Sequence, residues 1–247
     1  ISGGSPSMEN ALIFSASQKC SRATAIFPVP GDTLNLKGSG GVFRYEYKEE
    51  FFKTYKPEDT RRDGSFLEYY MKKADDGTLS EFGCMMTKMQ GTLNSTGNHI
   101  YISDIMLYRY SDVLLMMAEC ENGLGNPCAS YINEVRARAY GDNFAGNEYV
   151  EGTYAENELA ILQERDKEFV GEGKRWYDLV RKALREKSTN NIKFVADKLE
   201  SQASVVKSKM STIDALFFPI HYDELRFNDK LVQNPAYERE DESVELN

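Results

Sequence analysis

The chain has 247 residues and a net charge of −9, from 30 Lys and Arg against 39 Asp and Glu. This acidic balance disfavours nucleic acid as a partner, because nucleic-acid binding relies on basic residues that meet phosphates. No apolar run approaches the roughly 20 residues that a membrane-spanning helix needs. Neither a charged nor an apolar leader segment follows Ile1, so we expect a mature or truncated product.

The four cysteines form no Cys-x-x-Cys pair and have no histidine nearby, so the sequence predicts no metal site and no cofactor. Cys120 and Cys128 flank one predicted turn and could form a disulfide across it. We expect buried free thiols instead, because an unpaired cysteine usually behaves as a small apolar residue.

Residues 1–103 are rich in Gly, Ser and aromatic residues and have little helical periodicity. Glycine allows positive φ and proline fixes φ, so their frequent occurrence predicts long loops with short strands or helical turns. Loops on a rigid scaffold often carry ligand contacts, so we expect the variable ligand face here.

A first helix is predicted from residue 104 to 122, where Gly123 and Gly125 end it. Its segment 113–118 is apolar on nearly every side, which predicts a buried helix. Asn126 and Pro127 predict the start of a second helix, with Asn126 as N-cap. Apolar residues of this second helix share one face, namely Cys128, Tyr131, Ile132, Val135 and Ala139. Two such helices joined by a short turn resemble a tetratricopeptide (TPR) hairpin.

A third helix is predicted from Thr153 to about Val170, because Thr153 and Glu156 have the spacing of a capping box. Residues 171–173, with two glycines, should end it before a fourth helix over 174–183. A further amphipathic helix is expected at 192–199. The last structured stretch is predicted at 216–237, followed by a frayed acidic tail.

A dense charged run lies between Glu164 and Arg181. Glu164 and Glu168 lie one helical turn apart, and a pair of carboxylates would suggest a glycoside hydrolase. Such carboxylates must flank a substrate bond, however, whereas neighbours at i and i+4 point the same way. Charges interleaved with apolar residues favour ion pairs that lock one helix corner against another. We therefore predict a structural motif and no catalytic residue, with the members Arg109, Asp112, Glu164, Arg165, Glu168, Glu172, Arg175, Trp176, Asp178 and Arg181.

The order and spacing of these residues resemble the C-terminal half of the SusD/RagB family. The family pattern Glu-Arg-x-x-Glu-Phe, then Glu-Gly-x-Arg-x-x-Asp-Leu-x-Arg, matches residues 164–169 and 172–181. A closing Gln-Asn-Pro-Gly-Tyr element is matched at 233–237, with Ala236 in place of Gly. Asp166 stands where Arg is frequent, on a face that we expect to be exposed, and His221 stands where a second Pro is usual.

The resemblance implies a mainly α, SusD-like fold, with TPR-like helical hairpins and a loop-rich ligand-binding face. It divides one integrated domain into a variable region (1–103), a helical core (104–187) and a closing segment with the tail (188–247). Family members are about twice this length. Their lipidated N-terminal cysteine and further TPR-like helices would lie outside this chain.

Ligand contact is predicted in the densest aromatic and polar stretch, at Tyr45, Tyr47, Phe51 and Tyr55. Flat aromatic faces beside polar groups suit the apolar C–H faces and hydroxyl edges of sugars. The alternation of Phe43, Tyr45 and Tyr47 is equally typical of a half-buried strand that packs on the helices.

The function implied by the resemblance is non-catalytic binding of glycans at the outer-membrane surface, through a lipid anchor. The protein would deliver them to a SusC-like, TonB-dependent transporter, without binding nucleic acid. Two alternatives remain open from the residues: peptide capture within the same family, and a TPR-type scaffold for partner proteins.

Overall fold

The computed structural model describes residues 47–89, 91–97, 99–102, 104–187 and 212–237. The chain divides into two compact units: one contains residues 10–175, and the other contains residues 176–247 with the first nine residues. Tyr45 and the helix expected at 192–199 lie outside the described residues, as does the acidic tail from 238. The predicted three-part division stays a prediction.

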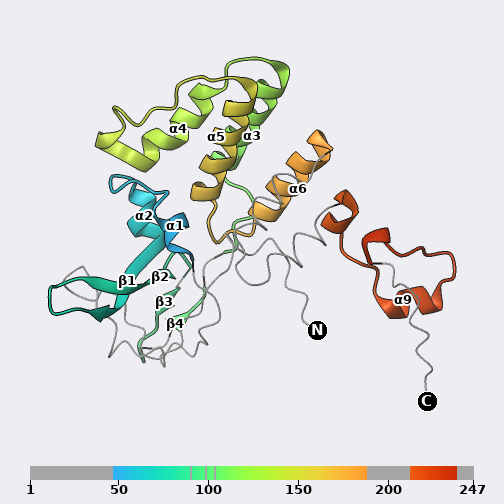
Figure 1. Ribbon diagram of the computed structural model, residues 1–247, viewed down its shortest axis with the longest axis horizontal. Coiled ribbons are helices and arrows are strands. Elements are labelled where there is room, and N and C mark those ends of the chain that lie inside the picture. The colour runs from blue at the N-terminus through green and yellow to red at the C-terminus, as the bar shows by residue number, and fades with distance from the viewer. Residues whose placement is uncertain (1–46, 90, 98, 103, 188–211, 238–247) are drawn as a thin grey trace. The chain divides into compact units, whose positions relative to one another are not determined.

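Among its described residues, the larger unit runs from two short helices through two antiparallel strand pairs to three longer helices (Figure 1). The short elements are α1 (Glu49–Phe52), α2 (Thr60–Ser65), β1 (Phe66–Lys73), β2 (Leu79–Met86), β3 (Thr92–Leu93) and β4 (His99–Ile100). β1 pairs antiparallel with β2, and β3 with β4. The longer helices are α3 (Tyr110–Leu124), α4 (Ala129–Tyr140) and α5 (Tyr154–Glu168), with the 3-10 turn η2 (Gly141–Asn143) after α4.

The helices α3 and α4 form the predicted helical hairpin, and α5 packs against both. The core between them contains Leu115, Ala118, Ile132 and Ala139, all fully buried. Small side chains at positions 118 and 139 take up little space, so the helices that carry them can approach closely. No helix among the described residues is long and apolar enough to cross a membrane.

Two helix starts differ from the prediction. The helix α3 begins at Tyr110 rather than 104, where the Asp112 carboxylate accepts a hydrogen bond from the Arg109 amide at 3.3 Å. The helix α4 begins at Ala129 rather than beside Asn126, because Glu151 caps it from a distant loop. Its carboxylate accepts from the amides of Cys128 and Ala129 at 2.9 and 2.8 Å. Asn126 donates to Glu121 instead.

The expectation that segment 113–118 is buried all round is wrong for half of its residues. Leu114, Leu115 and Ala118 are buried, as the hairpin core requires. The side chains at positions 113, 116 and 117 are exposed on the opposite side of α3. Apolar periodicity therefore identified a helix with two apolar faces, of which only one is covered.

Cysteine chemistry follows the prediction in part. Cys84, Cys120 and Cys128 are all free, and the first and last of these are buried. Burial, with a hydrogen bond to Glu151, raises the pKa of the Cys128 thiol to about 12, so it is inert at neutral pH. Cys120 is exposed, which corrects the expectation that it is buried.

The smaller unit contains the helix α6 (Arg175–Glu186), whose first residue belongs to the larger unit. It also contains a closing segment that side-chain amides hold together. This segment comprises η3 (Ile213–Leu216), α9 (Tyr222–Phe227) and η4 (Pro235–Tyr237). Gln233 accepts from the amide of Ile220 and donates to its carbonyl, at 2.9 and 3.0 Å. Asn234 donates to the carbonyls of Asp214 and Phe217, at 2.8 and 3.1 Å. Two side chains thus replace the backbone pairing that a strand would provide.

Two glycines after α5 permit a test of how closely the chain packs there. Gly171 and Gly173 have similar left-handed φ values of +76° and +72°. A Cβ at position 171 would lie 2.5 Å from the Met86 sulfur, whereas a Cβ at 173 would meet nothing within 4 Å. We expect Gly171→Ala to lower the free energy of unfolding by about 1–3 kcal/mol more than Gly173→Ala, measured by urea denaturation. Equal losses would show that Met86 moves aside without cost.

Candidate functional site

The predicted charged motif forms a column of carboxylates along α5 and the turn that follows. Glu164 and Glu168 lie on one face of the helix, and Glu172 follows four residues later, after the chain turns at Phe169. All three side chains are 5% exposed or less. Buried carboxylates at this spacing repel one another unless cations lie between them.

Arg61 of α2 supplies the central cation. Its guanidinium donates to Glu164 at 2.7 Å and to Glu168 at 3.1 Å, and it forms a two-pronged pair with Asp59 at 2.8 and 2.7 Å. Burial lowers the pKa of Arg61. The hydrogen bonds to Asp59 and the charge of Glu164 outweigh this effect, so the pKa is raised overall. One arginine thus joins three buried carboxylates.

Glu168 is the most heavily paired member of the column. Besides Arg61, it accepts from Arg138 of α4 at 2.7 Å and from Arg109, which precedes α3. Burial raises the pKa of Glu168, but the hydrogen bond and charge of Arg109 and the charges of Arg61 and Arg138 lower it to about 2. The side chain is therefore a fixed anion at neutral pH.

The two ends of the column are paired in the same way. Arg136 of α4 donates to Glu164 at 2.8 Å. Arg109 and Lys88, which follows β2, donate to Glu172 at 2.8 and 2.6 Å. Burial raises the pKa of Glu172, but these hydrogen bonds outweigh it and lower the value. Basic residues from α2, α4 and the segments beside β2 and α3 thus meet along one face of α5.

A second charged group surrounds the ring of Phe169. The charges of Arg109, Arg165 and Lys174 lie 4.6, 4.8 and 5.3 Å from its centroid, within the range of cation–π attraction. Asp112 pairs with Arg165 at 3.5 Å and with Lys174 at 2.6 Å. Phe169 therefore fills the space beneath the charges while Asp112 balances two of them.

The remaining motif residues lie around the start of α6. Arg175 pairs with Asp166 at 3.6 Å and donates to the Leu162 carbonyl at 3.0 Å. The side chain of Asp166 is only 13% exposed, so the expectation of an exposed face at this position is wrong. In the smaller unit, Trp176 is half-buried and Asp178 pairs with Arg181 at 3.2 Å.

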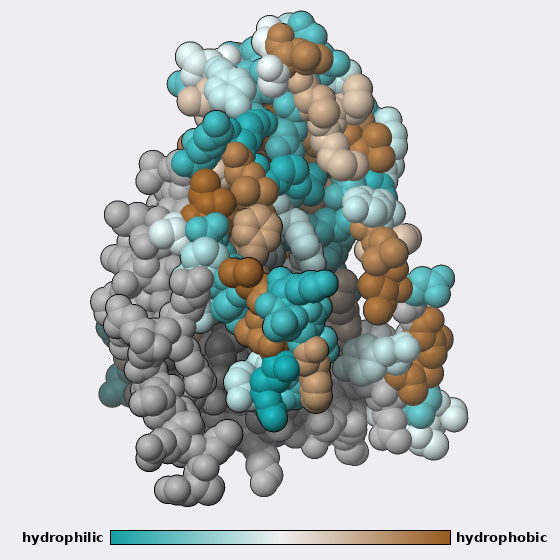
Figure 2. All heavy atoms as spheres, turned by 90° about the vertical axis from the view of Figure 1, so that its right-hand side faces the viewer, coloured by the Kyte–Doolittle hydropathy of each residue, from teal (hydrophilic) through white to brown (hydrophobic). Residues whose placement is uncertain are grey.

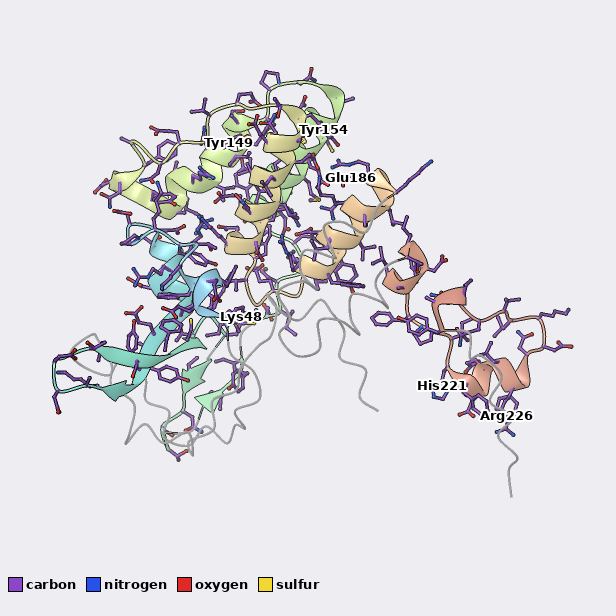
Figure 3. The ribbon with its side chains drawn as sticks, in the orientation of Figure 1. Lys48, Tyr149, Tyr154, Glu186, His221 and Arg226 are labelled. Carbon is purple, nitrogen blue, oxygen red and sulfur yellow. The ribbon has the colours of Figure 1, made fainter. Side chains whose placement is uncertain are left out.

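The sequence did not predict a polar network at the other end of α5. Asn157 accepts from Tyr149 at 2.6 Å and donates to Asn122 and Glu151 at 3.0 and 2.7 Å. Figure 3 marks Tyr149 on the loop between α4 and α5. The network ties this loop to α3 and to α5. Single polar residues on three segments gave no pattern that could have predicted it.

The predicted ligand-contact residues contribute to a second buried cluster. Tyr47 and Tyr55 are 2% and 3% exposed and pack around Phe66, with ring centroids 5.1 and 5.7 Å apart. The Tyr55 hydroxyl donates to the Lys167 carbonyl at 2.9 Å. Phe51 is half-buried, and Tyr45 lies outside the described residues. These contacts favour packing for the two tyrosines, whose rings would have to move before they could meet a ligand.

Exposed aromatic rings occur elsewhere, and three of them lie close together in the sequence of the closing segment, within the smaller unit. Phe218, Tyr222 and Phe227 are all more than half exposed, and the charge of Arg226 lies 5.6 Å from the Tyr222 ring. Figure 3 marks His221 and Arg226 on this segment, and Figure 2 shows apolar and hydrophilic side chains interspersed on the surface. The density of aromatic residues over 217–227 is the sequence signal that could have identified these rings.

The charged column has little capacity for chemistry. A glycoside hydrolase needs a carboxyl group that still holds its proton near neutral pH, which requires a raised pKa. Glu168 and Glu172 have lowered pKa values, and arginine or lysine donors occupy their oxygens. Within the described residues, no cluster of His, Cys, Asp and Glu is arranged to hold a metal ion.

The sequence model of the SusD family matches residues 30–237. The chain belongs to the SusD family. SusD-like protein P38 of Formosa agariphila is 33% identical over 141 residues, which cover 55% of this chain and 25% of that protein. The predicted mainly α, SusD-like fold is confirmed.

Two solved structures show how much of a SusD-like protein this chain represents. A SusD superfamily protein of Bacteroides fragilis has 29% identity and a TM-score of 0.72, covering 96% of this chain and 50% of that one. Surface glycan-binding protein A of Bacteroides uniformis shares the fold at 24% identity and a TM-score of 0.54, with 94% and 47% coverage. The SusD-family chain thus spans about half the length of these structures and a quarter of P38.

Removing one charge from the column tests its structural role. Glu168→Gln leaves Arg61, Arg109 and Arg138 without their shared anion, so we expect the free energy of unfolding to fall by about 3–5 kcal/mol. Chemical denaturation of this variant and of Asp75→Asn, an exposed acid in the turn between β1 and β2, provides the comparison. A loss no larger than that of the control would mean that the column contributes nothing to stability.

The lowered pKa values also predict how stability depends on pH. Glu168 holds its proton less tightly in the folded protein than in the unfolded chain, where its pKa is near 4.5. The stabilisation, about 3 kcal/mol for this residue, is therefore complete above about pH 5 and is lost as the pH falls toward 2. Urea midpoints between pH 7 and 2.5 should show this decline, and Glu168→Gln should flatten it. An unchanged slope in the variant would contradict the assignment.

Proposed function

We propose that the protein is a non-catalytic, cell-surface glycan-binding protein of the SusD family. The observation that carries the proposal is the family match over residues 30–237, which includes the charged motif and the closing segment. The fold is shared with a protein named for surface glycan binding. Charged residues of the motif hold elements together, which supports a role in capture rather than in bond cleavage.

The proposal includes the setting implied by the family. The protein would be held at the outer-membrane surface by an N-terminal lipid anchor. It would pass its ligand to a SusC-like, TonB-dependent transporter. Family membership supports both statements, and a pull-down of the transporter with the anchored protein would test them.

The ligand surface is proposed to combine exposed rings with polar neighbours. Tyr45 and Phe51 remain predicted contacts, whereas Tyr47 and Tyr55 would require their cluster to open. Tyr222, beside Arg226, offers an accessible ring and a hydrogen-bond donor in the closing segment. The net charge of −9 favours neutral over acidic glycans.

Affinity electrophoresis through native gels that contain a panel of neutral polysaccharides tests this function. We expect one glycan to retard the protein, and Tyr222→Ala or Tyr45→Ala to weaken binding about fivefold or more, because a stacked ring contributes about 1 kcal/mol or more. Tyr154→Ala, which removes an exposed ring at the start of α5, is the matched control.

The outcomes separate the alternatives. Retardation that is lost in a folded tyrosine variant supports glycan capture and places the contact. Retardation unchanged in every variant keeps the function and overturns the proposed residues. Absence of retardation in all gels, together with binding of a peptide mixture by calorimetry, would replace glycan capture by peptide capture.

A further inference from the structure

The amine of Lys167, in the last turn of α5, has no hydrogen-bonding or ionic partner among the described residues. Lys88 and Lys174 are also largely buried, and each of them pairs with a carboxylate at 2.6 Å. Buried polar groups nearly always have a partner, so an amine without one is an exception that requires a physical reason.

The acids beside Lys167 are already occupied by arginines. The two oxygens of Glu164 accept from Arg61 at 2.7 Å and from Arg136 at 2.8 Å. Both oxygens of Asp59 accept from Arg61, at 2.8 and 2.7 Å. Because a guanidinium presents several donors in a fixed plane, it holds these acids more firmly than a single amine would. Lys167 therefore lies within the electrostatic reach of two carboxylates with which it does not pair.

The amine lies instead against an aromatic ring. Its nitrogen is 5.8 Å from the centroid of the Tyr55 ring, and the Tyr55 hydroxyl donates to the carbonyl of Lys167 at 2.9 Å. The ring is buried, so the surrounding cluster fixes its position. Lys167 itself is half-buried, and its nitrogen still reaches solvent. A small reagent can thus meet the amine, whereas water solvates it on one side only.

These surroundings weaken the hold of the amine on its proton. Burial lowers the pKa of Lys167. The charges of Glu164 and Asp59 raise it and those of Arg61 and Arg136 lower it, and the pKa is lowered overall. A lysine with a lowered pKa carries a lone pair more often at neutral pH, and the lone pair is the nucleophile. Desolvated lysines beside other cations are the ones that form Schiff bases with carbonyl compounds.

We propose that Lys167 is a reaction site for small aldehydes. The nitrogen lone pair attacks the carbonyl carbon and forms a C–N bond, which gives a carbinolamine. The carbinolamine then loses its hydroxyl group and the remaining N–H proton as water. One neutral amine and one aldehyde thus give one imine and one water, and the reversible step consumes no oxidant or reductant.

The surroundings of the amine also set the class of aldehyde. Partial burial beside the flat Tyr55 ring favours a short carbon chain over a polymer. Arg61 and Arg136 act on the charge of the amine, so they favour an aldehyde whose remaining atoms are neutral or anionic. The site is separate from the proposed glycan contacts and does not depend on them.

Acetaldehyde with cyanoborohydride tests the site, because the hydride traps each imine as a stable secondary amine. Peptide mass mapping of the folded protein at pH 7 gives the rate of ethylation at each lysine. We expect Lys167 to react at least about threefold faster than Lys230, an exposed lysine of the closing segment, because more of Lys167 is neutral. Lys53, whose pKa the hydrogen bond to Glu49 raises, should react more slowly still. A rate at Lys167 no higher than that at Lys230 would overturn the proposal.

A matched lysine on the same helix separates the environment of the amine from its position in the chain. Gln163 is exposed one turn before Lys167, so Gln163→Lys adds a solvated amine to α5. The introduced amine should react at the rate of Lys230, and in concentrated urea all three rates should be equal. An advantage of Lys167 that the introduced amine shares, or that persists in urea, would show that the folded surroundings are not its cause and would overturn the proposal.

The pH dependence of ethylation gives an independent measurement. The rate at Lys167 should level off at a lower pH than the rate at Lys230, because a lysine with a lowered pKa loses its proton earlier in the titration. Coincident profiles for the two lysines would contradict the assignment.

Discussion

Buried carboxylates along α5 require cations, and that requirement organises the larger unit. An isolated carboxylate in the interior is costly, and three in a row add mutual repulsion. Arg61, Arg109, Arg136, Arg138 and Lys88 meet this requirement from elements that are distant in the sequence. The fork of Arg61 between Asp59 and two glutamates ties α2 to α5.

This arrangement separates architecture from recognition. The charged side chains of the motif pair with one another, so they hold helices in place and offer few free hydrogen-bonding groups to a ligand. Under the proposed function, recognition would fall to segments whose side chains are not needed for that framework. The closing segment illustrates this separation, because Gln233 and Asn234 hold its backbone while Tyr222 and Phe227 stay accessible.

Local patterns in the sequence predicted the helices of the larger unit, although they placed the starts of α3 and α4 too early. The capping box at Thr153 and the glycines after Glu168 mark α5 as the structure has it, since both signals act within a few residues. Glu151 caps α4 from 22 residues away, and no local signal reveals such a partner. The start of α4 was therefore placed too early.

Partners and faces were harder to predict than elements. The acidic column required cations, but its spacing could not select Arg61 from among 30 basic residues. Similarly, the aromatic run from Tyr45 to Tyr55 is compatible with packing or with ligand contact, because a ring suits both. Only the fold shows that Tyr47 and Tyr55 are enclosed around Phe66.

The distance along the chain between Arg61 and its acids has a consequence for folding kinetics. These contacts close loops of more than 100 residues, since the sequence separations are 103 and 107. The helical hairpin of α3 and α4 needs only a short loop and can form first, because closing a long loop costs more entropy. The arginine fork would then form after the hairpin. A fork that is absent from the transition state for folding acts on the rate of unfolding. Its strength would govern how slowly the native protein unfolds rather than how quickly it folds.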